Sequence, residues 1–232
     1  MGSEIRNIAL LSVDALRADH LSCYGYNRKT SPALDALADE YIKFNNCFSA
    51  SSFTREAVPS IITGQYPSDA THKDFSLASP TLGELVDESD FKTGVFHSNP
   101  YVSRAYGFDK GFDEFDDDLR MSQHKVIALF QRAVDKLRNR HYARAETINR
   151  RSLQWIDSLG DNPFLLWNHY MDTHGPYEPP SEYREQFYEN DLSNREAQKL
   201  YRRAAVTDPE SISESERQAM VDLYDGEISY VD

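Results

Sequence analysis

The chain has 232 residues, 40% of them hydrophobic, which is enough for one sizeable core or one large α/β domain. Its 38 acidic and 25 basic residues give a net charge of −13, which disfavours nonspecific binding, so we expect no nucleic-acid partner. Two cysteines, Cys23 and Cys47, are too few for a disulfide framework; we expect both to be reduced and at least one to lie in the core. No apolar run is long enough to span a membrane and no secretory signal pattern is present, so we expect a cytoplasmic protein.

The first predicted element is a strand over residues 8–13. Its apolar residues are continuous, as is typical of a central strand of a parallel sheet, and the strand is followed directly by Asp14. Ligands of open α/β sheets bind beyond the carboxyl ends of the strands, so Asp14 is a candidate ligand for a divalent cation. A helix cap or a surface turn is the alternative interpretation of this carboxylate.

Three helix starts follow in the first half of the chain. Ser31 and Pro32 are typical cap and first-turn residues, and apolar residues follow at helical spacing. A second segment, residues 54–64, begins with a hydroxyl side chain and ends with a glycine. Residues 81–84 have the pattern of a capping box and introduce a third helix.

Thr54 is the candidate nucleophile. A threonine hydroxyl is a weak nucleophile unless a metal or a base lowers its pKa, and the positive end of a helix dipole favours an anion beside it. An ordinary helix-capping threonine is the alternative. Pro59 conflicts with the predicted helix because proline removes a helical hydrogen bond.

Strands predicted over residues 93–96 and 164–169 alternate with helices, which indicates a mostly parallel sheet covered on both faces. Between them we expect an amphipathic helical insertion over about residues 121–160. Basic residues concentrate there: Lys125, Arg132, Lys136, Arg138, Arg140, Arg144, Arg150 and Arg151. They form either solvated helix faces or a basic rim that attracts an anionic substrate.

The last part of the chain is predicted to be a polar surface excursion over residues 178–211, followed by a helix. Ser213 and Glu216 have the spacing of a capping box, and the helix that they introduce is still continuing at Asp232. No linker or internal repeat is visible, so we expect one domain over residues 1–232.

Two histidines are candidates for chemistry. His174 follows the third predicted strand directly, where an imidazole can protonate a leaving oxygen or hold an anionic one. His72 follows a tyrosine–proline turn and could face the same cleft. An ordinary surface position is the alternative for both.

These segments together resemble the sulfatase family of the alkaline phosphatase superfamily. The matching segments run in order along nearly the whole chain: residues 13–21, 23–26, 30–38, 54–67, 106–113, 174–177 and 224–232. The resemblance implies an alkaline phosphatase/sulfatase-like α/β fold, with a mostly parallel central sheet and helices on both faces. It also implies a metal-dependent ester hydrolase that acts on anionic esters of a carbohydrate or a lipid headgroup.

The resemblance assigns roles to individual residues. Asp14 matches the first metal-binding aspartate, and Thr54 the position of the nucleophile, which is also a metal ligand. His174 matches an active-site histidine, and Asn99 lies where a substrate contact is expected. The implied cofactor is a divalent ion: calcium, magnesium, manganese or zinc.

Several positions depart from the family pattern. Ala15 stands where sulfatases usually have a second aspartate, and Glu56 and Val58 stand at the proline and arginine positions of the nucleophile motif. Threonine is not known as a formylglycine precursor, so we expect no formylglycine at Thr54. A threonine there is similar instead to the phosphodiesterases and the phosphoglycerol and phosphoethanolamine transferases of the superfamily.

Members of the family are roughly twice as long, and their remaining metal ligands follow the helix that reaches Asp232. We therefore expect a C-terminally incomplete fold. Three hypotheses stay open: a sulfate-ester hydrolase with a covalent intermediate on Thr54, a phosphodiesterase or phosphoalcohol transferase, and a degenerate, non-catalytic binding module. The two catalytic hypotheses require the side-chain oxygens of Asp14 and Thr54 to reach one shared cation.

Overall fold

The computed structural model describes residues 7–86, 90–118, 142–188 and 192–232. The chain divides into two compact units. Unit 1 comprises residues 1–12 and 48–171, and unit 2 comprises residues 13–47 and 172–232. The prediction of a single domain over residues 1–232 stays a prediction.

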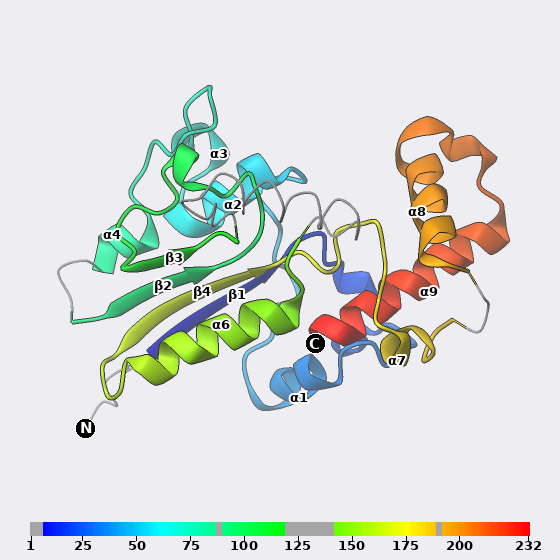
Figure 1. Ribbon diagram of the computed structural model, residues 1–232, viewed down its shortest axis with the longest axis horizontal. Coiled ribbons are helices and arrows are strands. Elements are labelled where there is room, and N and C mark those ends of the chain that lie inside the picture. The colour runs from blue at the N-terminus through cyan, green and yellow to red at the C-terminus, as the bar shows by residue number, and fades with distance from the viewer. Residues whose placement is uncertain (1–6, 87–89, 119–141, 189–191) are drawn as a thin grey trace, which may run out of the picture. The chain divides into compact units, whose positions relative to one another are not determined.

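Within these described residues, four strands form one sheet in the order β1-β4-β2-β3 (Figure 1). They are β1 (Asn7–Val13), β2 (Lys92–Phe96), β3 (Glu114–Asp116) and β4 (Phe164–Tyr170). β2 pairs in parallel with both β3 and β4. The predicted mostly parallel sheet is therefore confirmed, with β3 as a strand that the sequence patterns did not reveal.

The prediction that β1 is a central strand is wrong for the described part of the sheet. β1 lies at one end of the strand order, beside β4. Its apolar side chains are largely accessible, with Leu11 at 59% exposure, whereas all but the first residue of β4 are buried. A continuous apolar run predicts a strand, but the position in the sheet depends on which other strands pair with it.

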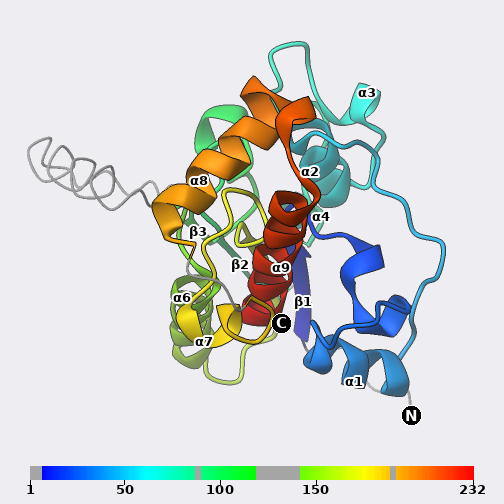
Figure 2. The same cartoon turned by 90° about the vertical axis from the view of Figure 1, so that its right-hand side faces the viewer.

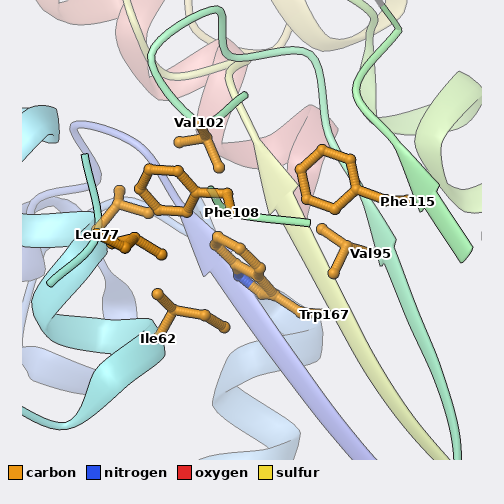
Figure 3. Close-up of a cluster of buried hydrophobic side chains, with 8 residues drawn as sticks. Ile62, Leu77, Val95, Val102, Phe108, Phe115 and Trp167 are labelled. Atoms are coloured by element: carbon orange, nitrogen blue, oxygen red, sulfur yellow. The ribbon is translucent and has the colours of Figure 1, made fainter. Parts of the chain in front are cut away.

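Helices cover both faces of the sheet in unit 1. α6 (Ala145–Ser158) packs on one face, where the ring of Trp155 lies so close to Gly94 that an added Cβ would be 2.8 Å from it. α2 (Thr54–Thr63) packs on the opposite face, because Val95 and Trp167 share a buried cluster with Ile62 (Figure 3). Glycine at position 94 is what permits α6 to approach the sheet this closely.

Unit 1 also contains shorter helices, which follow α2 along the chain. They are α3 (Pro67–Ala70), α4 (Leu82–Val86) and the 3-10 helix η3 (Arg104–Tyr106). The predicted capping box of α4 is confirmed, because Thr81 Oγ1 accepts from the Glu84 amide and Glu84 Oε2 accepts from the Thr81 amide.

The predicted insertion over residues 121–160 is described only in part. Its later part is confirmed as the helix α6. The earlier part of the predicted insertion, with Lys125, Arg132, Lys136, Arg138 and Arg140, lies outside the described residues.

After Val13, the described part of unit 2 consists of helices, turns and loops. Its elements are η1 (Ala18–His20), η2 (Ser22–Tyr24), α1 (Pro32–Glu40), α7 (Ser181–Arg184), α8 (Asn194–Arg202), the π-helix η4 (Arg203–Thr207), η5 (Pro209–Ser211) and α9 (Glu214–Val231). The predicted capping box of Ser213 and Glu216 at the start of α9 is confirmed.

The prediction of a surface excursion over residues 178–211 is wrong for α8. α8 packs beside α9 (Figure 2). It buries Ala197 and Leu200 in a cluster with Ala219 and Leu223 of α9. A capping box of Ser193 and Glu196 begins α8, with the same spacing as the box of α9. The segment is polar overall, so the narrow apolar stripe of α8 was not recognised from composition. Such a stripe is enough to pack a helix against another helix, here α9.

The cap of α1 differs from the predicted one. Ser31 occupies the N-cap position, but its side chain accepts no capping hydrogen bond. The amides of Ala33 and Leu34 donate instead to the two carboxylate oxygens of Asp232, at 2.8 and 2.9 Å. A carboxylate from the end of α9 therefore satisfies the free amides of this helix.

Both cysteines are free, as predicted, but neither is fully buried. Cys23 is half-buried against a small cluster of Leu21, Tyr224 and Ile228, and Cys47 is exposed. In the described part of the chain, no helix combines the length and the apolar character that crossing a membrane requires.

Candidate functional site

Asp14 is the first residue after β1 and lies at the start of a tightly held turn in unit 2. Thr173 Oγ1 donates to the carbonyl of Asp14. Tyr224 donates through its hydroxyl to the carbonyl of Ala15 at 2.7 Å and accepts from the amide of Arg17 at 2.9 Å. Burial raises the pKa of Tyr224, so the hydroxyl keeps the proton that it donates. The backbone that carries Asp14 is therefore fixed from two sides.

The turn after Asp14 uses an uncommon backbone conformation. Ala15 has a φ of +56°, in the left-handed region that aspartate and asparagine adopt more readily than alanine. The backbone at this position is thus compatible with a second acidic residue, although the sequence has none there.

His174 lies in unit 2, two residues after the buried Asp172, and is half-buried. Its Nδ1 donates to the carbonyl of Gly175 at 3.0 Å. That hydrogen bond selects the tautomer with the proton on Nδ1, which leaves Nε2 as the atom that can take up or release a proton. A glycine at position 175 avoids a clash, because an added Cβ would overlap the ring of Tyr201 unless that ring shifted.

Thr54 lies in unit 1 and is the first residue of α2, as predicted. Phe53 occupies the N-cap position, and its carbonyl accepts from the amides of Glu56 and Ala57. Thr54 is half-buried, so its side chain lies at the surface of the first helical turn rather than in the core. The alternative of an N-cap threonine does not match this register, which places Thr54 one residue inside the helix.

Hydrogen bonds between the preceding loop and the first turn stabilise the start of α2. Ser51 Oγ donates to Glu56 Oε2 at 2.6 Å and accepts from the amide of Phe53 at 3.1 Å. Pro59 does not break the helix, which continues to Thr63, whose hydroxyl donates to the Pro59 carbonyl. Val58, at the position where the family motif has an arginine, is buried in the same hydrophobic cluster as Ile62 and Trp167.

Asn99 is buried in the loop that follows β2. Asn99 Oδ1 accepts from the backbone amide of Tyr101 at 2.9 Å, and the backbone amide of Asn99 donates to His97 Nδ1 at 3.1 Å. Its Nδ2 donates to the sulfur of Met171. These contacts stabilise the loop, and a role in contacting substrate stays a prediction.

His72 is exposed in a short loop closed by an antiparallel bridge between Thr71 and Leu77. Its amide donates to the carbonyl of Ser76 at 2.9 Å. A contact of its ring with substrate also stays a prediction.

The donors predicted for a cation are a carboxylate at Asp14 and a hydroxyl at Thr54, both oxygen ligands that suit a divalent ion. Asp14 belongs to unit 2 and Thr54 to unit 1. Among the described residues, no group of three or more histidine, cysteine, aspartate or glutamate side chains gathers as a complete ligand set. The sharing of one cation by these two residues stays a prediction.

Sequence patterns missed an ionic network in unit 2. The fully buried carboxylate of Asp225 accepts from His20 Nδ1, from the Tyr26 hydroxyl and from Arg28 Nη1, at 2.7, 2.7 and 2.8 Å. Arg28 also pairs with Asp222 at 2.6 Å. The sequence offered one signal of this network: Asp222 and Asp225 lie three residues apart, on the otherwise apolar face of α9.

A buried aromatic and histidine group in unit 1 was also missed. His97 follows β2 and packs beside the rings of Phe115 and Trp167. Burial, with a smaller effect of His169, lowers the pKa of His97 to about 3. Trp167 Nε1 donates to Ser12 Oγ, which lies 2.9 Å from His169 Nδ1.

A comparison with protein families decides the affiliation of the chain. The family model described as Sulfatase matches residues 6–232.

The chain belongs to the sulfatase family. Among curated relatives of this sulfatase-family chain, an N-acetylglucosamine-6-O-sulfatase of Bacteroides thetaiotaomicron is 26% identical over 107 residues. That match covers 44% of the chain and 19% of the relative. The phosphoethanolamine transferase EptC of Escherichia coli is 30% identical over 95 residues, covering 40% of the chain and 16% of the relative.

Solved structures confirm the fold. A phosphonate monoester hydrolase of Agrobacterium radiobacter has a TM-score of 0.69 at 17% identity, covering 97% of the chain and 57% of that structure. The periplasmic domain of EptC from Escherichia coli, in complex with zinc, has a TM-score of 0.63 at 18% identity, covering 99% and 57%. The sulfatase-family chain thus spans less than two thirds of these proteins.

Proposed function

We propose that this chain transfers the sulfuryl group of a sulfate ester to Thr54 and then to water. In the first step a bond forms between Thr54 Oγ and sulfur while the bond from sulfur to the alcohol oxygen breaks. The threonine proton passes to water, and the leaving oxygen takes the proton that His174 carries on Nε2 in its doubly protonated form. In the second step water attacks the sulfur and the Oγ–sulfur bond breaks. Thr54 Oγ and His174 Nε2 each take up one of the two protons of that water, and sulfate is released.

The observation that carries this proposal is the position of Thr54. Its hydroxyl stands on the first residue of α2, half-buried, inside the segment that the family model covers. A helix start favours the negative charge that an ester sulfate brings. The side chains of Ser51 and Glu56 lock the turn before it, which keeps the hydroxyl in a defined place.

A divalent cation would be held by the Asp14 carboxylate and the Thr54 hydroxyl, together with ligands beyond these two. When bound, it lowers the pKa of a ligating hydroxyl and stabilises developing negative charge. The two oxygen donors suit magnesium, calcium or manganese, and the similar EptC domain is a zinc complex. The hold of Thr173 and Tyr224 on the turn would keep Asp14 in place for this role.

Transfer of a phosphoryl group is the second candidate function. Two observations favour it: threonine replaces the formylglycine precursor at position 54, and buried Val58 replaces the arginine of the sulfatase motif. Similarity to a phosphoethanolamine transferase agrees with it. The same bond changes would then take place at phosphorus, with water or an alcohol as the final acceptor.

The alcohol part of the substrate is proposed from the relatives. A sulfated amino sugar is the first choice, because one relative is an N-acetylglucosamine-6-O-sulfatase. A lipid headgroup is the second, because another is a phosphoethanolamine transferase. The cytoplasmic location remains a prediction that cell fractionation would test.

Turnover of an aryl sulfate and of a bis-aryl phosphate should be measured with the full chain and each of Mg²⁺, Ca²⁺, Mn²⁺ and Zn²⁺. We expect Thr54→Ala to lower turnover by at least about a thousandfold. Thr147→Ala is the matched control, since Thr147 is also a half-buried threonine in the first turn of a helix of unit 1. A covalent adduct of one sulfuryl or phosphoryl group on Thr54, detected by mass spectrometry after acid quenching, would support the proposed intermediate.

The outcomes separate the hypotheses. A large preference for the aryl sulfate supports the hydrolase, and a preference for the phosphate diester supports the second candidate. Full activity of Thr54→Ala overturns both. Binding of substrate without turnover under every metal condition would favour the non-catalytic binding module.

A further inference from the structure

An ester sulfate or phosphate keeps a negative charge while its group is transferred, so a cation beside the nucleophile lowers the barrier. The side chain at the fourth position after Thr54 supplies none, because Val58 is buried among apolar residues. The residue directly after Thr54 is Arg55, also in the first turn of α2. Its guanidinium is the nearest cation in sequence to the candidate nucleophile.

Two aromatic rings hold the guanidinium of Arg55. Its central carbon lies 4.2 Å from the ring centroid of Tyr101 and 5.0 Å from that of Phe75. Tyr101 comes from the loop after β2, and Phe75 from the loop closed by the bridge between Thr71 and Leu77. Contacts of this kind are favourable, and they fix a side chain that otherwise has many rotamers.

The contacts with the rings leave the donors of Arg55 available. A guanidinium has five N–H groups, and a cation–π contact uses none of them. Within the described residues, no carboxylate, carbonyl or hydroxyl accepts a hydrogen bond from Arg55. Two other arginines of unit 1 differ: Arg104 donates to Asp109 and to the Phe115 carbonyl, and Arg151 pairs with Asp116.

The partial burial of Arg55 adds a reason for its guanidinium to bind an anion. Arg55 is partly removed from water, and Phe75 is half-buried as well. A partly desolvated guanidinium without a protein acceptor is costly to maintain, and an anionic partner would offset that cost. The group to be transferred must approach Thr54 Oγ to about 3–3.5 Å, which brings its other oxygens to the same helical turn.

We infer that Arg55 binds two non-bridging oxygens of the tetrahedral anionic group, sulfate or phosphate, that Thr54 attacks. The inference rests on the proposed function for the identity of the attacking hydroxyl. The planar fork of a guanidinium matches two such oxygens, whereas a lysine ammonium offers a single point of charge. Tyr101 and Phe75 are positioning residues, because they act through the guanidinium.

Equilibrium binding of inorganic sulfate and of inorganic phosphate tests this inference without requiring turnover. Titration calorimetry should be carried out on the full chain and on Arg55→Gln, Arg55→Lys and Arg104→Gln. We expect Arg55→Gln to weaken binding of one or both anions at least about tenfold, and Arg55→Lys to weaken it less. Arg104→Gln is the matched control, because Arg104 also lies over an aromatic ring but has its donors occupied.

A second pair of variants keeps the test independent of folding. Tyr101→Phe retains a ring under the guanidinium and should bind anions as the parent does, whereas Tyr101→Leu should bind them more weakly at an unchanged unfolding temperature. Unchanged affinity in folded Arg55→Gln overturns the inference, as does the absence of anion binding by the parent chain. The tighter-bound anion of the two identifies the chemistry that the site prefers.

Thr54→Ala separates the two proposals. If this variant binds anions as the parent does but loses turnover, both proposals are supported. If it keeps turnover while Arg55→Gln loses anion binding, the role of Arg55 stands and the nucleophile is wrong.

Discussion

The buried imidazole of His97 should make this protein lose stability in mild acid. The side chain is fully buried beside Phe115 and Trp167, and burial lowers its pKa to about 3. In the unfolded chain a histidine has a pKa of about 6.5. The unfolded state therefore binds the proton first as the pH falls, and His97 contributes less to stability at each step between about pH 6.5 and 3.

The magnitude follows from proton linkage. One proton bound only by the unfolded state changes the free energy of unfolding by about 1.4 kcal/mol per pH unit. Acidification from about pH 8 to about pH 5 should thus lower stability by about 2 kcal/mol through His97 alone. Carboxylates with ordinary pKa values remain mostly ionised at the end of this range, so the range isolates the imidazole from acid denaturation of carboxylates.

Urea denaturation of the parent and of His97→Asn at several pH values measures this effect. The asparagine removes the titrating group but can still accept from the amide two residues on, as Nδ1 of His97 accepts from Asn99. We expect the variant to be less stable at neutral pH because ring packing is lost, and its stability to depend less on pH by about 1.4 kcal/mol per unit. His72→Asn, which changes an exposed ring, is the control and should keep the parent slope. Equal slopes in the parent and His97→Asn would refute the reasoning.

Three further predictions concern unit 2. Asp225→Ala removes a buried acceptor shared by three donors and should lower the free energy of unfolding by about 3–5 kcal/mol in urea denaturation. Asp19→Ala, in an exposed ion pair, should have a much smaller effect, and comparable losses would contradict the argument. Ala15→Asp should strengthen binding of a divalent cation at least about tenfold, or about 1.4 kcal/mol, in titration calorimetry. Ala15→Asn controls for the backbone, and equal affinity of the two variants would argue against a cation at this turn. Gly175→Ala should lower the unfolding free energy by about 1–3 kcal/mol through overlap with Tyr201, with recovery in the double variant carrying Tyr201→Leu. A neutral Gly175→Ala would show that the ring moves away at no cost.

Local chemistry explains which features could be predicted from the sequence. The capping boxes that begin at Thr81 and Ser213 depend on residues three apart, and both form as predicted. Asp14 at the end of a strand and Thr54 at the start of a helix likewise follow from neighbouring residues. The family resemblance is of the same kind, since it rests on short segments in order along the chain.

Features that join distant segments could not be predicted in this way. The edge position of β1 depends on its pairing with β4, and the burial of α8 depends on the apolar face of α9. Asp232 caps a helix that begins about 200 residues earlier, in place of the nearby serine. Such contacts compete with local preferences and leave no periodic signal of their own.

By itself, the sequence determined β1, β2, β4 and the capped helices α4 and α9, the family, and the identities of the candidate cation ligand and nucleophile, because each depends on residues close together along the chain. Only the tertiary structure decided that His97 is a buried neutral imidazole and that two rings from separate loops hold Arg55. The physical reason is that burial, desolvation and the approach of side chains are set by the whole fold around a residue.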